Sequence, residues 1–354
     1  MHGLNNTTVE DQALLMAAVG YVAAACVLFL VGFFGFFLNL FAIVLMWRDK
    51  ELWTPLNVIL FNLVCSDFSV AVLGNPWTMV SAASYGWIFG RSMCIAYGFF
   101  MSLLGITSIT TLTVLAMERY AMVSRSFHTT RCVSIRHAGF MVAGIWLYSF
   151  TLTVPPLVGW GRYSIEAANI SCSVNWEDRS VNAKTYIIYL FFFGLFLPLI
   201  VIIFSYAHII RTTRKNKMRM GQLRKVEARI AYTILLMITA FLLAWTPYSV
   251  FALLVQFGDP TLITPATGVL PALLAKSSIC YNPVIYVGLN SQFRQHFRQI
   301  IKLKRVRSSE ECKMAVSKYV TSELVTDGRH TRLTSDKRQE ENSNRNSRAI
   351  DMDV

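Results

Sequence analysis

The chain has 354 residues, of which 54% are hydrophobic and only 15% are charged, and its formal net charge is +13. About a quarter of the residues of a soluble domain are charged, so this composition excludes an ordinary soluble protein and indicates a membrane protein. An excess of Lys and Arg is also typical of nucleic-acid-binding proteins, but the positions of these residues along the chain favour a membrane.

Seven apolar segments follow one another, each long enough for the roughly 20 residues that a helix needs to cross the hydrocarbon core. Lipid offers the backbone no hydrogen-bond partners, so such segments form helices. They cover about residues 17–47, 54–82, 92–118, 138–158, 184–210, 230–257 and 264–289. We therefore predict an all-α membrane protein, a seven-transmembrane helix bundle over residues 17–289.

Basic residues are concentrated on one side of this bundle. If the N-terminus, residues 1–16, lies outside the cell, the cytoplasmic segments hold 28 of the 33 Lys and Arg residues. This distribution follows the positive-inside rule. It predicts a multi-pass protein of the plasma membrane with an extracellular N-terminus. It also predicts that the basic residues contact membrane lipids and that the protein does not bind nucleic acid. Asn5 and Asn6 begin overlapping sequons and are predicted glycosylation sites.

Two of the seven cysteines, Cys94 and Cys172, fall on the outer side of the predicted bundle. Disulfides persist in that compartment, because no reducing system acts there. We predict a bond between them, which ties the loop at 158–183 to the top of the third segment. The alternative is a pair of free thiols.

An amphipathic stretch follows the seventh segment. Between residues 290 and 305, apolar side chains recur at the spacing of one helical face, with basic side chains beside them. The apolar residues are Phe293, Phe297, Ile300 and Ile301, and the basic ones are Arg294, Arg298, Lys302 and Arg305. We predict an amphipathic interfacial eighth helix over 290–305 and a disordered cytoplasmic tail over 306–354.

Lys276 lies near the middle of the seventh segment, within LLAKSSICYNPVIY (273–286). A charged lysine at mid-bilayer costs about 2.5–3.5 kcal/mol on insertion scales, so it needs a reason. Three interpretations compete. The lysine forms a structural salt bridge with Asp67, binds an anionic diffusible ligand, or acts as a nucleophile that forms a Schiff base with an aldehyde. Apolar surroundings favour the neutral, nucleophilic amine.

Other motifs mark the ends and bends of the segments. MERYAMV (117–123) ends the third, AWTPY (244–248) bends the sixth at its proline, and NPVIY (282–286) closes the seventh. Asn39 and Asp67 are polar residues within the first and second segments. An acid within a membrane segment is a functional candidate.

In this order, these motifs resemble the rhodopsin-like (class A) family of G-protein-coupled receptors, over about residues 17–303. The family usually has DRY where this chain has ERY, and Cys-Trp-x-Pro where this chain has AWTP. The resemblance implies a receptor and not an enzyme, with a heterotrimeric G protein, arrestin and a receptor kinase as partners. The activation residues that it implies are Asn39, Asp67, Glu118, Arg119, Tyr120, Asn282, Pro283 and Tyr286.

The stretch AKSSICYNPVIY (275–286) is similar to the seventh span of the opsins, whose lysine carries retinal as a protonated Schiff base. The resemblance implies 11-cis or all-trans retinal on Lys276. Phe241, Trp245 and Tyr248 match the aromatic positions that line the opsin pocket. For each aromatic alone, ordinary core packing is the other interpretation.

A buried cation needs an anion. In vertebrate visual opsins the counterion is a Glu three residues after the third-span cysteine, and here that position is Tyr97. Glu166, six residues before Cys172, matches the loop glutamate that serves as counterion in many non-visual and invertebrate opsins. We predict Glu166 as counterion, against a solvated loop acid, and expect Tyr97 to form hydrogen bonds near the imine. Opsins with this arrangement are typically bistable.

The stretches WLYSFTLTVPPLVGWGRY (146–163) and CSVNWEDRS (172–180) look like the encephalopsin and teleost multiple-tissue group of opsins, or their invertebrate ciliary-type relatives. A short, basic third intracellular loop, about 211–229, and NSQ (290–292) favour Gi/Go-type G proteins over Gq. A retinal photoisomerase of the opsin fold and a receptor for a diffusible ligand are the rival functions. A light-driven ion pump is a more distant one, because ERY and NPVIY are not pump motifs.

Overall fold

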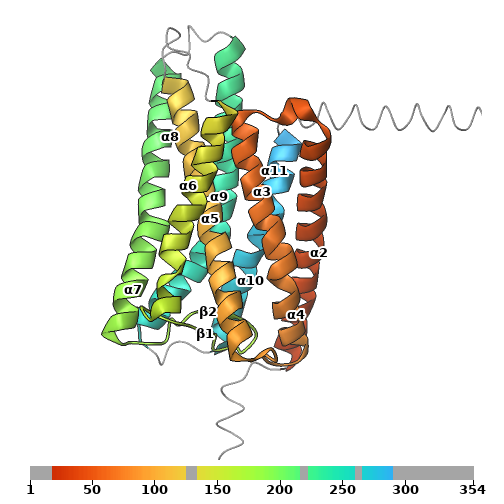
Figure 1. The fold of residues 1–354 in the computed structure, drawn as a ribbon, viewed down its shortest axis with the longest axis vertical. Coiled ribbons are helices and arrows are strands. Elements are labelled where there is room, and N and C mark those ends of the chain that lie inside the picture. Colours follow the sequence, from red (N-terminus) through yellow and green to blue (C-terminus); the bar gives the residue numbers. More distant parts are fainter. Residues whose placement is uncertain (1–17, 125–133, 216–221, 260–264, 290–354) are drawn as a thin grey trace, which may run out of the picture. The chain divides into compact units, whose positions relative to one another are not determined.

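Seven helical segments lie side by side in the computed structural model, which describes residues 18–124, 134–215, 222–259 and 265–289 (Figure 1). The first four segments are α2 (Ala18–Arg48), α3 with α4 (Pro55–Leu73 and Asn75–Ala83), α5 (Gly90–Ser124) and α6 (Ile135–Thr153). The fifth consists of α7 (Val181–Phe191), the π-helical turn η3 (Phe192–Phe196) and α8 (Leu197–Lys215). The sixth is α9 (Gln222–Phe257), and the seventh consists of α10 (Val269–Ser277), η7 (Ser278–Cys280) and α11 (Tyr281–Leu289). Short 3-10 turns are η1 (Lys50–Leu52), η2 (Pro155–Val158) and η6 (Pro265–Gly268).

The seven-helix bundle predicted from the sequence is thereby confirmed. Five of the segments qualify as membrane spans by length and composition: Ala18–Arg48, Pro55–Ala83, Gly90–Val123, Val181–Arg214 and Ala228–Phe257. The 19-residue α6 and the divided seventh segment complete the set. The predicted glycosylation sites, eighth helix and tail lie outside the described residues.

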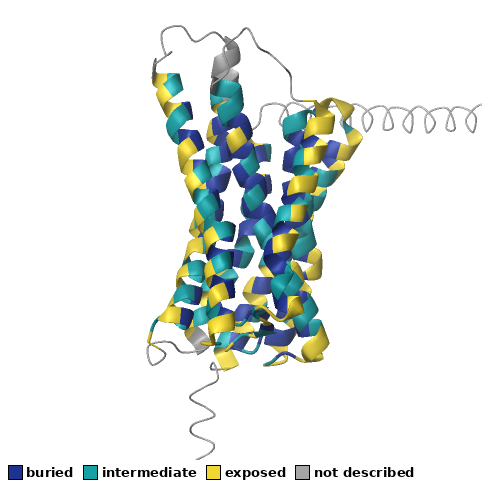
Figure 2. Cartoon of the chain, turned by 60° about the vertical axis from the view of Figure 1, so that its left-hand side comes forward, coloured by how far each residue is buried: buried dark blue, intermediate teal, exposed yellow. Residues whose placement is uncertain are grey.

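Exposed residues lie on the outward faces of the helices and buried residues face inward (Figure 2). Many of the exposed residues are large and apolar. Phe34, Ile203 and Leu243 are 52%, 65% and 71% exposed. Apolar surface of this extent is unfavourable in water, and soluble proteins rarely expose it in large contiguous patches. The bundle therefore has the surface of a multi-pass membrane protein.

Two prolines have different consequences for their helices, because one starts a helix and the other lies inside one. Thr54 caps α3 by accepting a hydrogen bond from the Asn57 N–H, and Pro55 starts the helix where its missing N–H costs nothing. Pro247 instead lies inside α9, where it leaves the carbonyl of Leu243 without its helical donor. The helix continues through this proline, so α9 is one long helix that lacks one backbone hydrogen bond close to Trp245.

A polar network joins four segments in the middle of the bundle. Asn282 donates to Oδ2 of Asp67 at 2.9 Å, and Ser108 donates to Oδ1 at 3.4 Å. Asn39 donates to the carbonyls of Gly35 at 2.8 Å and of Ile279 at 3.0 Å. A Cβ on Gly35 would lie 2.5 Å from the Ile279 side chain, so glycine is what lets α2 approach the seventh segment this closely. Buried polar groups are stable here because they bond one another.

A β-hairpin closes one end of the bundle, which we call the hairpin end (Figure 1). Its strands β1 (Tyr163–Ile165) and β2 (Cys172–Val174) pair antiparallel, with Ile165 opposite Cys172. The disulfide between Cys94 of α5 and Cys172 of β2 is present, which confirms the predicted bond. It fixes the hairpin against the third segment.

Replacing both Cys94 and Cys172 by Ala should lower the free energy of unfolding by about 2–4 kcal/mol, because the unfolded chain regains the freedom that the bond removes. Thermal unfolding of the purified receptor in detergent micelles measures this. Cys26→Ala, at an exposed position of α2, is the matched control and should leave the melting temperature unchanged. Equal melting temperatures for all three proteins would contradict a stabilising role of the disulfide.

Candidate functional site

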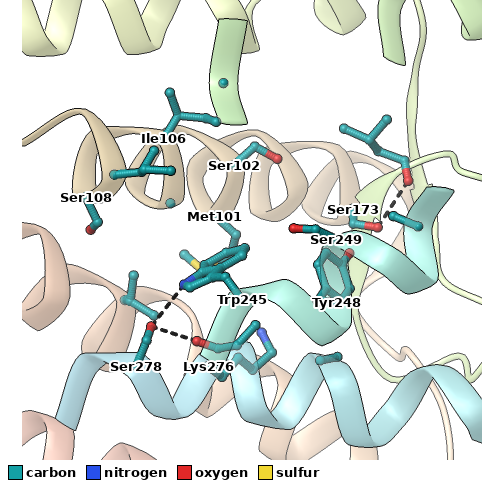
Figure 3. A pocket seen from close by; sticks show the side chains of 18 of the residues that line it. Met101, Ser102, Ile106, Ser108, Ser173, Trp245, Tyr248, Ser249, Lys276 and Ser278 are labelled. Atoms are coloured by element: carbon teal, nitrogen blue, oxygen red, sulfur yellow. Dashed lines mark hydrogen bonds between the residues drawn. The ribbon is translucent and has the colours of Figure 1, made fainter. Parts of the chain in front are cut away.

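A cavity of about 190 Å³ lies inside the bundle between α5, α9, the seventh segment and the hairpin. Most of its wall is apolar, and Figure 3 shows Trp245 in it between Met101 and the segment that carries Lys276 and Ser278. A larger cavity of about 640 Å³ lies on the hairpin side and has Glu166, Tyr248 and Lys276 in its wall as well. An apolar cavity with a few polar groups is the usual form of a small-molecule site.

Lys276 lies in the last turn of α10, with its side chain on the walls of both cavities. Its Nζ donates a hydrogen bond to the Tyr97 hydroxyl at 2.6 Å and lies 5.3 Å from the centre of that ring. In the described part of the chain, neither Asp67 nor Glu166 forms an ion pair with it. The structure therefore does not support the structural salt bridge to Asp67, whose carboxylate is bonded by Asn282 and Ser108 instead.

Glu166 follows β1 and turns its carboxylate toward the cavity. Tyr248 donates to Oε1 at 2.7 Å, and the Ser171 hydroxyl donates to Oε2. The Glu166 N–H bonds the Ser171 carbonyl at 2.9 Å, and Asn169 closes the turn with φ of 58°, in the left-handed region that Asn tolerates. The side chain is half-buried and bonded on both oxygens, unlike a solvated loop acid.

The three aromatic residues predicted on the sixth segment come together on one face of α9. Trp245 stacks on Phe241 with ring centres 5.6 Å apart and contacts Tyr248 edge-on at 6.2 Å. Its Nε1 donates to the Ser278 hydroxyl at 3.1 Å (Figure 3). A Cβ on Gly105 would lie 3.0 Å from the indole, so the small residue leaves room for the Trp245 ring.

The ERY residues lie at the opposite end of the bundle. Glu118 and Arg119 form an ion pair, and their side chains are only 7% and 4% exposed. Tyr120 packs edge-on against Phe204 and His208 of α8. A second link at this end ties two segments, because Tyr206 of α8 donates to the Ala231 carbonyl of α9 at 2.9 Å. These contacts are remote from the cavity, and the bond from Tyr206 to Ala231 ties α9 to α8 at this end.

Residues missed by the sequence prediction are the hydroxyl partners of the site, Ser171 and Ser278, and Gly105. A single serine in an apolar helix gives no periodic signal, because it usually bonds the carbonyl one turn back. The sequence signal for Gly105 is a glycine inside a predicted helix, which can mark the close approach of another side chain.

A short loop fastens the hairpin end of α9. Arg179 donates to the carbonyls of Gly258 at 2.7 Å and of Val255 at 3.3 Å, and Gln256 donates to the Asp178 carbonyl at 3.1 Å. Hydrogen bonds from the backbone and side chain of Ser180, together with the nearby Arg162, hold the pKa of Asp178 below its ordinary value. The Asp178 carboxylate pairs with Arg162 at 2.7 Å.

Asp178→Asn should lower the melting temperature at neutral pH. A carboxyl with a lowered folded-state pKa stabilises the protein above its unfolded pKa of about 3.9, and this stability is lost as pH falls through the folded value. The difference between variant and wild type should therefore shrink as pH is lowered to about 3. Thermal unfolding at several pH values measures it, with Glu177→Gln, an exposed neighbour, as control. An equal loss at neutral and acid pH would show that the charge of Asp178 is not what stabilises the loop.

Comparison with known proteins identifies the family of this chain. The sequence profile described as "7 transmembrane receptor (rhodopsin family)" matches residues 38–286. The chain belongs to this family. It is a receptor rather than an enzyme, and a heterotrimeric G protein is the partner that the family implies.

The receptor is similar to several opsins. It is 36% identical to parapinopsin of Ictalurus punctatus, over 80% of this chain and 82% of the relative. It is 33% identical to the Gq-coupled rhodopsin of Mizuhopecten yessoensis and 34% identical to melanopsin of Phodopus sungorus. These matches cover 76% and 77% of this chain, but only 57% and 61% of the two relatives.

The crystal structure of squid rhodopsin matches with a TM-score of 0.77 and 30% identity, over 82% of this chain and 87% of that one. Together, the relatives and this structure establish an opsin-like G-protein-coupled receptor. The finer likeness to the encephalopsin and multiple-tissue group stays a prediction.

Proposed function

We propose that the receptor senses light through retinal attached to Lys276 as a protonated Schiff base, and signals to a G protein. The observation that carries this proposal is the position of the lysine. Its nitrogen reaches a largely apolar, aromatic cavity and bonds a phenol rather than a carboxylate. A lysine kept for structure would have an acid as its partner, whereas a nucleophile must be free to bond a ligand carbon.

The residues of the cavity fit retinal. The apolar walls suit a long hydrocarbon chain, Phe241 and Trp245 offer flat faces to a conjugated system, and Lys276 supplies the amine that an aldehyde requires. Retinal, when bound, supplies the absorption of light and the change of shape that follows.

In this proposal Glu166 is the counterion. The hydroxyl groups of Tyr248 and Ser171 donate to its two oxygens, an arrangement that suits an ionised carboxylate. Glu166 and Lys276 share the walls of both cavities without touching, so Tyr97 is the direct partner of the nitrogen and Glu166 the nearby charge. We also infer that the pigment is bistable, because the receptor resembles opsins that use the loop glutamate as counterion.

Activation follows from the contacts of α9. Trp245 meets the cavity two residues before Pro247, where the helix lacks a backbone hydrogen bond. A push on the indole favours outward rotation of the half of α9 that precedes Pro247, and the bond between Tyr206 and Ala231 opposes this rotation. Release of Arg119 from Glu118 on α5 accompanies it in this proposal. Light would therefore shift the population between two packings of the same bundle.

We further infer a plasma-membrane receptor with its N-terminus and hairpin end outside, phosphorylated by a receptor kinase and bound by arrestin. The distribution of basic residues supports this orientation. Among G proteins, the short third loop favours the Gi/Go class. The Gq coupling named for the Mizuhopecten yessoensis relative makes Gq the competing choice.

The receptor loaded with 11-cis-retinal should accelerate nucleotide exchange on a Gi/Go protein at least tenfold on illumination, with less effect on Gq. Binding of a non-hydrolysable GTP analogue measures this. Lys276→Ala, the matched control, should show no light response. Light-dependent change of the chromophore without any nucleotide exchange would instead establish a retinal photoisomerase. A response to a soluble ligand in the dark, unaffected by Lys276→Ala, would establish a receptor for a diffusible ligand.

Glu166→Gln should move most of the pigment from visible to near-ultraviolet absorption at neutral pH. Without the carboxylate, the protonated Schiff base loses the charge that stabilises it. Absorption spectra across a pH series measure this, and the visible band should return on acidification. Glu177→Gln, in the same loop, should leave the spectrum unchanged. A wild-type spectrum for Glu166→Gln would exclude Glu166 as the counterion.

A further inference from the structure

A chain of hydrogen bonds leads away from Lys276 into the second segment. The lysine nitrogen lies 2.6 Å from the Tyr97 hydroxyl, and that hydroxyl lies 2.6 Å from Oγ1 of Thr78. Thr78 in turn donates to the carbonyl of Gly74, with a longer separation of 3.4 Å. Three segments of the bundle thus contribute to one line of polar groups.

The chemistry of the end group fixes the direction of this chain. A charged lysine can only donate hydrogen bonds, so the Tyr97 oxygen must accept from it. The single hydroxyl proton of Thr78 goes to the Gly74 carbonyl, so at the contact between Thr78 and Tyr97 the tyrosine hydroxyl is the donor. Tyr97 is 4% exposed and Thr78 is 1% exposed, so both hydroxyl groups are buried within the bundle.

Other groups hold the Tyr97 ring independently of Thr78. The ring packs edge-on against Trp87 with centres 5.3 Å apart, in a cluster with the Cys94–Cys172 disulfide. Thr78 therefore contributes the direction of the hydroxyl rather than the place of the ring. Among the charged groups near the site, Glu166 is bonded by Tyr248 and Ser171, and Asp67 by Asn282 and Ser108.

We propose that Thr78 is a positioning residue for the Lys276 site: by accepting the Tyr97 proton, it turns the lone pairs of that oxygen toward the lysine nitrogen and so stabilises its charged form. Without Thr78, the acceptor that the described residues leave for the Tyr97 proton is the lysine nitrogen in its uncharged form, which favours the neutral nitrogen. The inference rests on the proposed function, because it assigns Thr78 a part in setting the charge of the attachment site.

The test uses the full-length receptor without retinal, in detergent micelles at one mildly alkaline pH. Formaldehyde and cyanoborohydride methylate only neutral amines, so the initial rate of methylation at Lys276, followed by mass spectrometry of its peptide, reports the uncharged share. Thr78→Val should raise this rate about three- to tenfold, as expected for the loss of one hydrogen bond to a buried group. Thr78→Ser keeps the hydroxyl and should retain the wild-type rate. Lys50, on an exposed turn, is the internal standard in every sample.

Tyr97→Phe provides the second arm. Thr78 acts through Tyr97 in this proposal, so Thr78→Val should add nothing to the rate in a Tyr97→Phe background. A wild-type rate for Thr78→Val, or equal and additive effects of the two changes, would overturn the proposal. Thr78→Ala, with a smaller side chain, repeats the test if Thr78→Val lowers the melting temperature.

A pH profile of the pigment gives a further readout that a merely structural role would not move. With retinal bound, Thr78→Val should lose its visible band at a lower pH than wild type, whereas Thr78→Ser should not. The methylation assay needs no retinal, so the two proposals can fail separately. If no retinal isomer forms a pigment but Thr78→Val still accelerates methylation, the proposed function fails and the role of Thr78 stands. If a pigment forms but the methylation rates are equal, the role of Thr78 fails alone.

Discussion

Placing a lysine nitrogen in the middle of an apolar bundle is the constraint on which the other features of this receptor depend. An unpartnered charge at that depth is costly, and a carboxylate in direct contact would satisfy the lysine so well that its nitrogen would be unavailable to a ligand. The structure provides an intermediate arrangement. A neutral phenol, Tyr97, touches the nitrogen, and an acid, Glu166, lies elsewhere in the same cavity wall. The charge is thereby stabilised while the amine still borders open space.

Helix α5 connects this site to both ends of the molecule. Cys94, Tyr97, Gly105 and Ser108 recur at helical spacing, so they share the inward face of one helix. In order, they hold the hairpin, bond Lys276, admit Trp245 and reach Asp67. The same helix ends in the Glu118–Arg119 pair. A change in the cavity therefore acts on the helix that holds the hairpin, contacts Lys276 and Trp245, and ends in the Glu118–Arg119 pair.

The sequence predicts some of these features well, for physical reasons. Long apolar segments form helices in lipid, because only a helix pairs all of their backbone polar groups internally. Hydropathy alone therefore predicts the seven segments. The disulfide followed from the side of the membrane on which Cys94 and Cys172 fall. The lysine was conspicuous because a charge in such a segment is rare.

Other features depend on tertiary contacts that no local pattern carries. The π-helical turn η3 and the 3-10 turn η7 divide spans whose composition reads as continuous helix. Thr78 looks like any threonine in an apolar segment, and only the fold brings it to Tyr97 from 19 residues away along the chain. The separation of Glu166 from Lys276 is likewise a product of hairpin geometry, which spacing along the chain does not determine.

The most direct test is to locate the chromophore chemically. The purified receptor would be incubated with 11-cis-retinal in the dark, reduced with borohydride, digested and analysed by mass spectrometry. The reduction converts an imine to a stable amine, so the proposed attachment predicts one retinyl group, on the peptide that contains Lys276. An adduct confined to exposed lysines, or none with any retinal isomer, would contradict a covalent retinal at this site.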